Sequence, residues 1–113
     1  MEEVNGQQLK YRCADIRASF AVYFYTPLCG TCRVAEKMLQ VVEATLPGLP
    51  LYKSNINFMS ELAFEWEIKS VPCLILVEHG KVARKLYAMR SVSDLYEALK
   101  PLLNKEAGKE QKE

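Results

Sequence analysis

Residues 20–32 read FAVYFYTPLCGTC, an apolar run followed by two cysteines three positions apart. The run from Phe20 to Tyr25 is too short for a helix of its own and is rich in Phe, Tyr and Val, which is typical of a strand buried on both faces of a sheet. A helical pattern begins at the cysteines. Cys29 would then lie at a helix start, where backbone N–H groups favour negative charge, and Cys32 could close a small disulfide ring with it. This arrangement indicates a reversible thiol–disulfide couple.

The chain has 113 residues, which is enough for one domain with a core and too few for two. Half of the residues are hydrophobic and the net charge is +1, with Lys and Arg spread along the chain. That charge pattern argues against nucleic acid or an anionic membrane as the main partner. No run approaches the ~20 apolar residues of a spanning helix, so we expect a cytoplasmic protein. Four cysteines in that compartment favour redox or metal chemistry over a scaffold held by disulfides.

Apolar periodicity predicts four helices and five strands. The helices share apolar positions spaced three or four apart, and the strands are short apolar runs bounded by Gly, Pro or Asn. The expected helices cover 7–16, 28–46, a segment beginning near Asn57, and 92–104; the expected strands cover a short segment around Val4, then 19–25, 49–56, 74–77 and 82–87. Two β-α-β crossovers followed by a hairpin predict an α/β fold, with a mixed sheet and helices on both faces.

Two helices carry further expectations. The second helix is expected to bury one apolar stripe, made of Val34, Met38, Val41, Val42 and Leu46. The last helix is expected to open on a capping box from Ser91 to Asp94 and to be kinked or shortened by Pro101. After it, residues 105–113 are mostly charged, and we expect them to form a disordered tail.

The order of three features resembles the thioredoxin family over residues 4–104. These are the motif from Cys29 to Cys32 after the buried strand, Val71-Pro72 before the next strand, and a hairpin turn at Gly80. The resemblance implies a thioredoxin-like domain over residues 1–104, with a central mixed sheet flanked by helices on both faces. It also implies that Pro72 follows a cis peptide bond beside the active site.

The resemblance implies that this chain reduces disulfides in other proteins. Cys29 would attack the substrate disulfide, and Cys32 would then attack Cys29 and release the reduced substrate. The expected substrate-binding residues are Leu28, Gly30, Thr31, Val71 and Pro72. A thioredoxin-reductase-like protein or a small thiol would recycle the pair. We expect a monomer with no cofactor and no bound metal.

Two positions depart from the family pattern. Tyr23 stands where the family buries an aspartate under the second cysteine. Because the ordinary pKa of tyrosine is near ~10, it would be a poor base at neutral pH, and we expect mixed disulfides to resolve slowly. Lys53 matches the lysine that accompanies the aspartate, so we expect it to lack that partner, and either to reach toward water or to take a role in catalysis.

The remaining cysteines and the single histidine leave alternatives open. Cys73 follows Pro72, where the family usually has threonine, and we expect it close to Cys29. It could be a small hydrophobic residue of the sheet, a partner in an alternative disulfide, or a third ligand with Cys29 and Cys32 for zinc or an iron–sulfur cluster. A non-catalytic adaptor of the same fold is a further alternative. We expect Cys13 in the core and His79 facing solvent.

Overall fold

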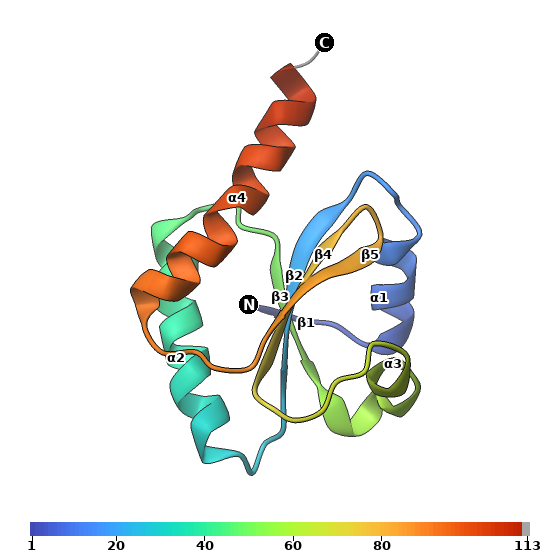
Figure 1. Cartoon of the computed structure of the whole chain (residues 1–113), viewed down its shortest axis with the longest axis vertical. Coiled ribbons are helices and arrows are strands. Elements are labelled where there is room, and N and C mark those ends of the chain that lie inside the picture. Colours follow the sequence, from blue (N-terminus) through green and yellow to red (C-terminus); the bar gives the residue numbers. More distant parts are fainter. Residues whose placement is uncertain (112–113) are drawn as a thin grey trace.

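The computed structural model describes residues 1–111, with side chains described as far as residue 103. Five strands form one sheet in the order β1-β3-β2-β4-β5 (Figure 1). The strands are β1 (Glu2–Glu3), β2 (Ser19–Tyr25), β3 (Leu51–Asn55), β4 (Cys73–Glu78) and β5 (Lys81–Leu86). The helices are α1 (Gly6–Cys13), α2 (Gly30–Thr45), the 3-10 turn η1 (Ile56–Phe58), α3 (Ser60–Glu65) and α4 (Val92–Gln111).

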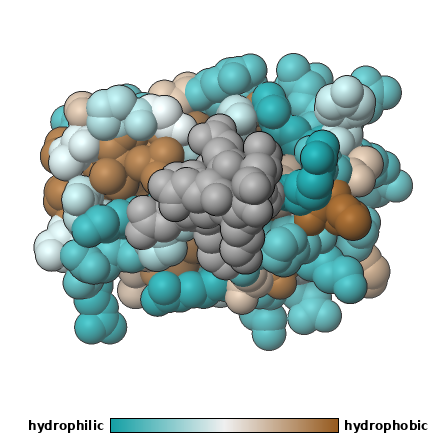
Figure 2. Space-filling view, turned by 90° about the horizontal axis from the view of Figure 1, so that it is seen from above, coloured by the Kyte–Doolittle hydropathy of each residue, from teal (hydrophilic) through white to brown (hydrophobic). Residues whose placement is uncertain are grey.

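The sheet is mixed and covered on both faces, which confirms the expected fold class. Strands β1 and β2 pair parallel with β3, whereas β4 pairs antiparallel with both β2 and β5. Figure 1 shows α2 and α4 on one face of the sheet and α1 and α3 on the other. Seen from above, hydrophilic residues lie along much of the outline of the molecule, with hydrophobic residues showing between them (Figure 2).

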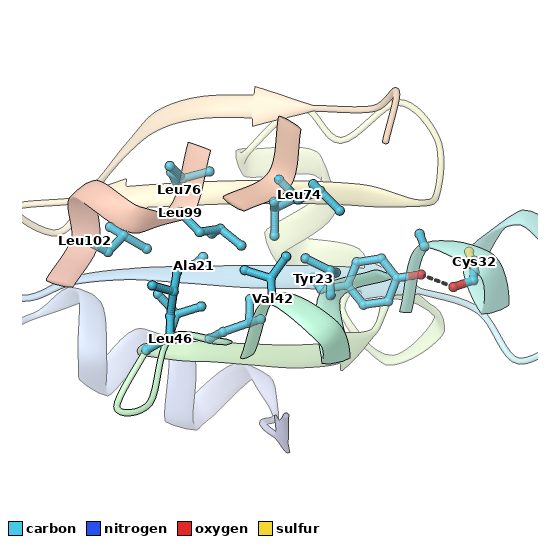
Figure 3. Packing of buried hydrophobic residues seen from close by; sticks show 14 residues of the cluster. Ala21, Tyr23, Cys32, Val42, Leu46, Leu74, Leu76, Leu99 and Leu102 are labelled. Atoms are coloured by element: carbon cyan, nitrogen blue, oxygen red, sulfur yellow. Dashed lines mark hydrogen bonds between the residues drawn. The ribbon is translucent and has the colours of Figure 1, made fainter. Parts of the chain in front are cut away.

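Strand β2 is buried on both faces, as its composition predicts. Ala21 and Tyr23 point into one cluster with residues of α2 and α4, which we call the α2/α4 core (Figure 3). Phe20, Val22 and Phe24 point into a second cluster with residues of α1 and α3, which we call the α1/α3 core. Because side chains alternate along a strand, one apolar run without polar breaks serves both cores. This central strand fixes the position of the segment that follows it.

The buried face of α2 matches the predicted stripe only in part: Val42 and Leu46 are buried and Met38 packs against the α2/α4 core, as predicted. The helix buries Cys32, Ala35, Leu39 and Val42, whereas Val34 is 60% exposed and Val41 is 51% exposed. The helix has two neighbouring rows of apolar residues. The sequence pattern favours the row with the larger aliphatic residues as the buried one. The row that faces the sheet has small residues at its start, where α2 lies over Tyr23.

Several predicted helix ends were also wrong by a few residues. Helix α1 ends at Cys13 and not at residue 16. Asn57 does not cap the third helix, because the Asn55 side chain accepts the Asn57 N–H at 3.0 Å and α3 begins only at Ser60. Of the two hydrogen bonds of the capping box predicted for α4, the one to the Ser91 side chain is confirmed: Ser91 Oγ accepts the Asp94 N–H at 3.0 Å.

Helix α4 is longer than its sequence predicts. Pro101 lies inside it and does not end it, and the helix is assigned as far as Gln111. The backbone of residues 105–111 is thus helical where we expect a disordered tail, and residues 112 and 113 lie outside the described residues. None of the helices within residues 1–111 has the length and the apolar character needed to cross a membrane.

The hairpin between β4 and β5 packs against the loop that enters β2. His79 and Gly80 both have positive φ, 56° and 76°, which is typical of a two-residue type I′ turn. The His79 N–H donates to the Ala18 carbonyl at 3.1 Å, and His79 Nδ1 lies 3.0 Å from the Ile16 carbonyl oxygen. A Cβ at position 80 would overlap the carbonyl oxygen of Cys13. Glycine is therefore required at position 80, both for its positive φ and for the close approach of the Cys13 carbonyl. His79 is exposed, as expected.

Replacing Gly80 by alanine tests this packing. We expect Gly80→Ala to lower the free energy of unfolding by about 1–3 kcal/mol more than Gly48→Ala does, because only at Gly80 does the new methyl group meet backbone. Gly48 is the matched control, since its φ is 85° and a Cβ there meets nothing within 4 Å. Gly48→Ala alone should cost about 1 kcal/mol. Urea unfolding of both variants measures the difference, and equal losses would contradict the contact.

Candidate active site at the start of helix α2

Cys29 occupies the N-cap position of α2. Its backbone is extended, with φ −90° and ψ 112°, and its Sγ accepts a hydrogen bond from the Cys32 N–H at 3.1 Å. The first N–H groups of a helix lack partners within the helix and carry partial positive charge. The sulfur is thus held by a donor that favours the thiolate over the thiol. The side chain is only partly buried, so the sulfur can meet another molecule.

Thr31 and Gly30 form the rest of the exposed turn. The hydroxyl oxygen of Thr31 lies 3.3 Å from Cys29 Sγ, so it can donate a second hydrogen bond to a thiolate. A Cβ at position 30 would meet nothing within 4 Å. Gly30 therefore lies on open surface, where another molecule can approach the backbone.

Cys32 lies in a different environment from Cys29. It is 2% exposed and belongs to the α2/α4 core. A bulky disulfide can reach the first cysteine of the pair and not the second. This difference in access suits a sequence of reactions in which Cys29 acts first and Cys32 acts from inside the protein.

The second part of the site is the segment that enters β4. The peptide bond between Val71 and Pro72 is cis, as the family resemblance implies. Phe24 near the end of β2 pairs with Cys73 at the start of the antiparallel β4. Pro72 and the loop that carries Cys29 consequently lie at the same end of the sheet. Val71 and Cys29 both pack against the α2/α4 core, and Leu28 beside them is 94% exposed. The structure thus brings the predicted site residues to one surface.

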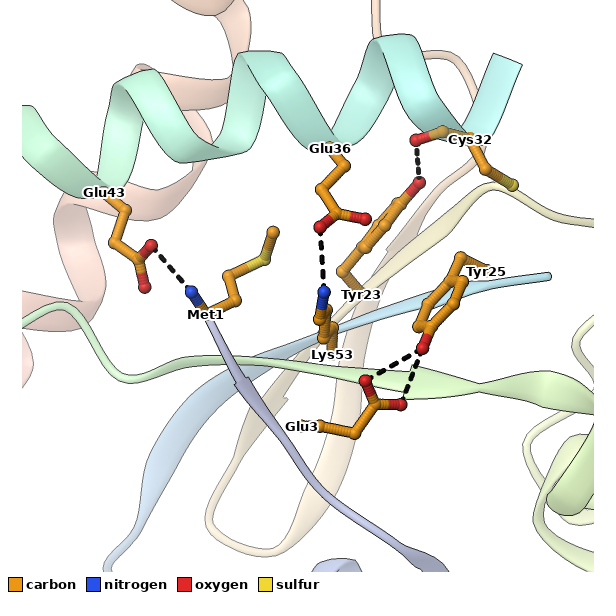
Figure 4. Close-up of polar contacts among 8 residues, drawn as sticks. All are labelled: Met1, Glu3, Tyr23, Tyr25, Cys32, Glu36, Glu43 and Lys53. Carbon is orange, nitrogen blue, oxygen red and sulfur yellow. Dashed lines mark hydrogen bonds and ion pairs between the residues drawn. The ribbon is translucent and has the colours of Figure 1, made fainter. Parts of the chain in front are cut away.

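Tyr23 lies beneath the cysteine motif and is fully buried. Its hydroxyl donates to the Cys32 carbonyl oxygen at 2.5 Å (Figures 3 and 4). Burial raises the pKa of Tyr23 above its ordinary value, and the negative charge of Glu36 raises it further. The side chain is therefore a neutral hydrogen-bond donor at physiological pH. It holds the first turn of α2 onto the sheet and offers no base to the cysteines.

Lys53 has a partner, contrary to the expectation from the sequence. Its Nζ lies 2.9 Å from Glu36 Oε2, and both side chains are mostly buried (Figure 4). Glu36 lies one turn after Cys32 on α2, on the side that faces the sheet. Glu36 is not predicted from the sequence, because the family pattern places its acid at the strand position that Tyr23 occupies here. A charged residue next to the small Ala35 of α2 is the signal that could have revealed it.

Tyr25, next to this ion pair, is also held as a neutral phenol. Its hydroxyl donates to both carboxylate oxygens of Glu3, at 2.8 and 2.7 Å. Burial raises the pKa of Tyr25 to about 12, and the hydrogen bond to Glu3 and the charges of Glu3 and Glu36 act in the same direction. Tyr23, Tyr25 and the ion pair of Lys53 with Glu36 thus lie together below the motif.

Cys73 does not lie with the redox pair, and this corrects the sequence expectation. It is fully buried in the α1/α3 core, on the opposite face of the sheet from Cys29 and Cys32. Burial raises the pKa of Cys73 to about 11, although a hydrogen bond to Tyr87 and the charge of Lys85 act against the rise. The three cysteines therefore do not form a ligand set. Within the described residues, no group of three or more His, Cys, Asp or Glu side chains could hold a metal ion.

Comparisons with known proteins agree with this geometry. A family model described as Thioredoxin matches residues 1–101. Thioredoxin-like protein YusE of Bacillus subtilis (strain 168) is 41% identical over 100 residues, which cover 88% of this chain and 92% of that protein. Thioredoxin of Chlamydia pneumoniae is 33% identical over 86 residues, which cover 76% of this chain and 80% of that protein.

Solved structures show the same fold. Chloroplastic thioredoxin z matches with a TM-score of 0.75 and 19% identity, covering 92% of this chain and 95% of that chain. Mitochondrial thioredoxin 3 from Saccharomyces cerevisiae, in its oxidized form, matches with a TM-score of 0.75 and 18% identity, covering 90% of this chain and 95% of that chain. The predicted thioredoxin fold is confirmed.

Tyr23 and the partly buried Tyr25 predict how stability depends on alkaline pH. Both have a raised pKa in the folded protein, whereas in the unfolded chain their pKa is near ~10. Unfolding therefore releases protons at high pH, and the free energy of unfolding should fall as the pH rises above about 10. Tyr23→Phe and Tyr25→Phe should each make this fall shallower.

Urea unfolding in reducing buffer between about pH 8 and about pH 11 measures this dependence. Tyr11→Phe is the matched control, because the Tyr11 ring is 83% exposed and the variant should keep the wild-type slope. A wild-type slope in Tyr23→Phe would show that the Tyr23 hydroxyl ionises as freely in the folded protein as in the unfolded chain.

Proposed function

This chain belongs to the thioredoxin family of thiol–disulfide oxidoreductases, and we propose that it reduces disulfides in other proteins through Cys29 and Cys32. The observation that carries the proposal is the contrast within the pair. Cys29 is accessible and its sulfur accepts a backbone N–H at the start of α2, while Cys32 is buried one turn further on.

The reaction follows from this contrast in two displacement steps. The Cys29 thiolate attacks one sulfur of the substrate disulfide, so that a mixed disulfide forms and the other substrate sulfur leaves as a thiolate and takes a proton. The Cys32 sulfur then attacks Cys29 Sγ. The Cys29–Cys32 disulfide forms, and the second substrate thiol is released. The substrate gains two electrons and two protons, and the pair of cysteines loses them.

The substrate would lie along the surface around Cys29. Leu28, Val71 and Pro72 supply apolar contact, and Gly30 and Thr31 complete the exposed turn. We expect an extended substrate segment to pair with the backbone at Val71, as in strand addition at a sheet edge. Such a contact recognises the substrate through its backbone, so it would accept proteins of different sequence.

The second step differs from the usual family pattern at its proton acceptor. Tyr23 is neutral and its hydroxyl is committed to the Cys32 carbonyl. The proton of Cys32 would thus pass to solvent or to the departing substrate sulfur and not to a side chain at position 23. We therefore expect mixed disulfides to resolve more slowly than in family members that bury an aspartate there.

The oxidised pair must be reduced again after each turnover. We propose a thioredoxin-reductase-like protein or a small thiol as the reductant, and a monomer in the cytoplasm as the working state. Cys13 and Cys73 are free thiols, and free thiols persist most readily in a reducing compartment.

Cysteine variants test the two roles. In an insulin reduction assay driven by dithiothreitol, Cys29→Ser and Cys32→Ser should both fall to the rate of dithiothreitol alone. Only Cys32→Ser should accumulate a mixed disulfide with insulin, because it keeps the attacking sulfur and lacks the resolving one. Non-reducing gel electrophoresis and mass spectrometry identify that adduct.

Cys73→Ala is the control for this experiment. Since Cys73 lies on the other face of the sheet, the variant should reduce insulin at close to the wild-type rate. A trapped adduct in Cys29→Ser and none in Cys32→Ser would reverse the assigned roles. Wild-type protein that leaves the rate of dithiothreitol unchanged would contradict the proposed activity.

A further inference from the structure

The segment between α3 and β4 carries the backbone with which the proposed substrate strand would pair. It covers residues 66–72, ends on Val71 and Pro72, and belongs to no helix or strand. In Figure 1 it runs through the lower half of the molecule, where α2 also begins. Such a segment presents one fixed backbone to a partner only if neighbouring elements hold it in place. The contacts of this segment therefore bear on substrate binding.

Lys85 of β5 holds the start of the segment. Its Nζ donates to the Trp66 carbonyl at 2.9 Å and to the Glu67 carbonyl at 3.2 Å. Because Lys85 pairs with Ile75, which lies in the α1/α3 core, its side chain is on the face of the sheet that α3 covers. The last carbonyls of a helix have no partner within the helix, and a cation there stabilises them. Lys85 thus fixes the end of α3 to the sheet.

Tyr87, which directly follows β5, holds the next part of the segment. Its hydroxyl oxygen accepts the Lys69 N–H at 3.2 Å, and its hydroxyl donates to the Glu67 carbonyl at 3.4 Å. Glu67 has a φ of 54°, a left-handed conformation that is costly for a residue with a side chain. Such a conformation persists only where the surrounding contacts determine it. The Glu67 carbonyl accepts from both Lys85 and Tyr87, so these two side chains supply such contacts.

The ring of Trp66 attaches the same segment to β2. It meets the Phe24 ring edge to face, with ring centroids 6.1 Å apart. Phe24 in turn pairs with Cys73, the first residue of β4. The segment is therefore attached through residues 66–69 on one side and through β4 on the other. Only residues 70–72 lie between these attachments, which leaves the backbone at the proposed substrate contact little freedom.

We propose that Lys85 and Tyr87 are positioning residues for the reduction of protein disulfides. They hold residues 66–69 so that the Val71 backbone meets an extended substrate segment in one conformation. This inference rests on the proposed function. A backbone that is already fixed loses less conformational entropy when the substrate binds. Loss of these hydrogen bonds should therefore slow the reaction with disulfides in peptide chains and spare the reaction with disulfides that have no backbone to pair.

Two disulfides of different size test this role on the reduced full-length protein. Insulin carries its disulfides within peptide chains, whereas hydroxyethyl disulfide has no peptide backbone. Acid quenching, alkylation and mass spectrometry give the second-order rate constant at which each one oxidises Cys29 and Cys32. Tyr87→Phe and Lys85→Met should each lower the ratio of the insulin rate constant to the hydroxyethyl disulfide rate constant about threefold or more. A general loosening of the fold would change both rate constants together and leave the ratio unchanged.

Control variants separate these hydrogen bonds from other effects of the substitutions. Lys85→Arg can still donate to the two carbonyls, so it should restore most of the ratio. Arg84→Met should keep the wild-type ratio, because Arg84 is exposed and pairs with Leu76 of the α2/α4 core, on the other face of the sheet. Cys73→Ala removes the hydrogen bond between Cys73 and Tyr87 and should also keep the ratio.

The ratio of the two rate constants decides the proposal. A wild-type ratio in both Tyr87→Phe and Lys85→Met overturns it, and a wild-type ratio in one of them removes that residue from the assignment. An equal loss in Arg84→Met or Cys73→Ala also overturns it. Wild-type protein that does not react with insulin at all would contradict the proposed function itself, so the two failures are distinguishable.

Discussion

The hydrogen bond from the Cys32 backbone N–H to the Cys29 sulfur joins the fold of this protein to its chemistry. It exists because β2 ends just before a loop that places Cys29 at the N-cap of α2. The position of the helix depends in turn on the α2/α4 core, where Leu39 and Val42 pack with residues of α4 and of the sheet. Disturbing that packing would move the donor away from the sulfur.

Tyr23 links the buried strand to the same helix turn from below. Its hydroxyl reaches the Cys32 carbonyl, so Cys32 is held at both its N–H and its C=O. The raised pKa of Tyr23 means that this support is a neutral contact over the physiological pH range. Beside Tyr23, the charges of Lys53 and Glu36 form an ion pair. Tyr23 thus supports the first turn of α2 through a neutral hydrogen bond.

The sequence predicted the parts of the site that depend on local pattern. The buried strand, the helix start at Cys29, the cis bond before Pro72 and the hairpin at Gly80 each have a distinct local or family signature. The side of the sheet on which Cys73 lies depends on its register against β2, and the partner of Lys53 depends on how α2 is rotated. The position of Cys73 and the partner of Lys53 both depend on how the sheet and the core assemble, which a short stretch of sequence does not determine.

The reactivity of Cys29 in mildly acidic solution tests the central claim most directly. The reduced protein and an unstructured peptide covering residues 26–35 would be treated with iodoacetamide, and the rate at each cysteine followed by mass spectrometry. A sulfur held as a thiolate by the Cys32 N–H should react at least about tenfold faster in the protein than in the peptide, despite its partial burial. Equal or slower alkylation of Cys29 in the protein would contradict the account.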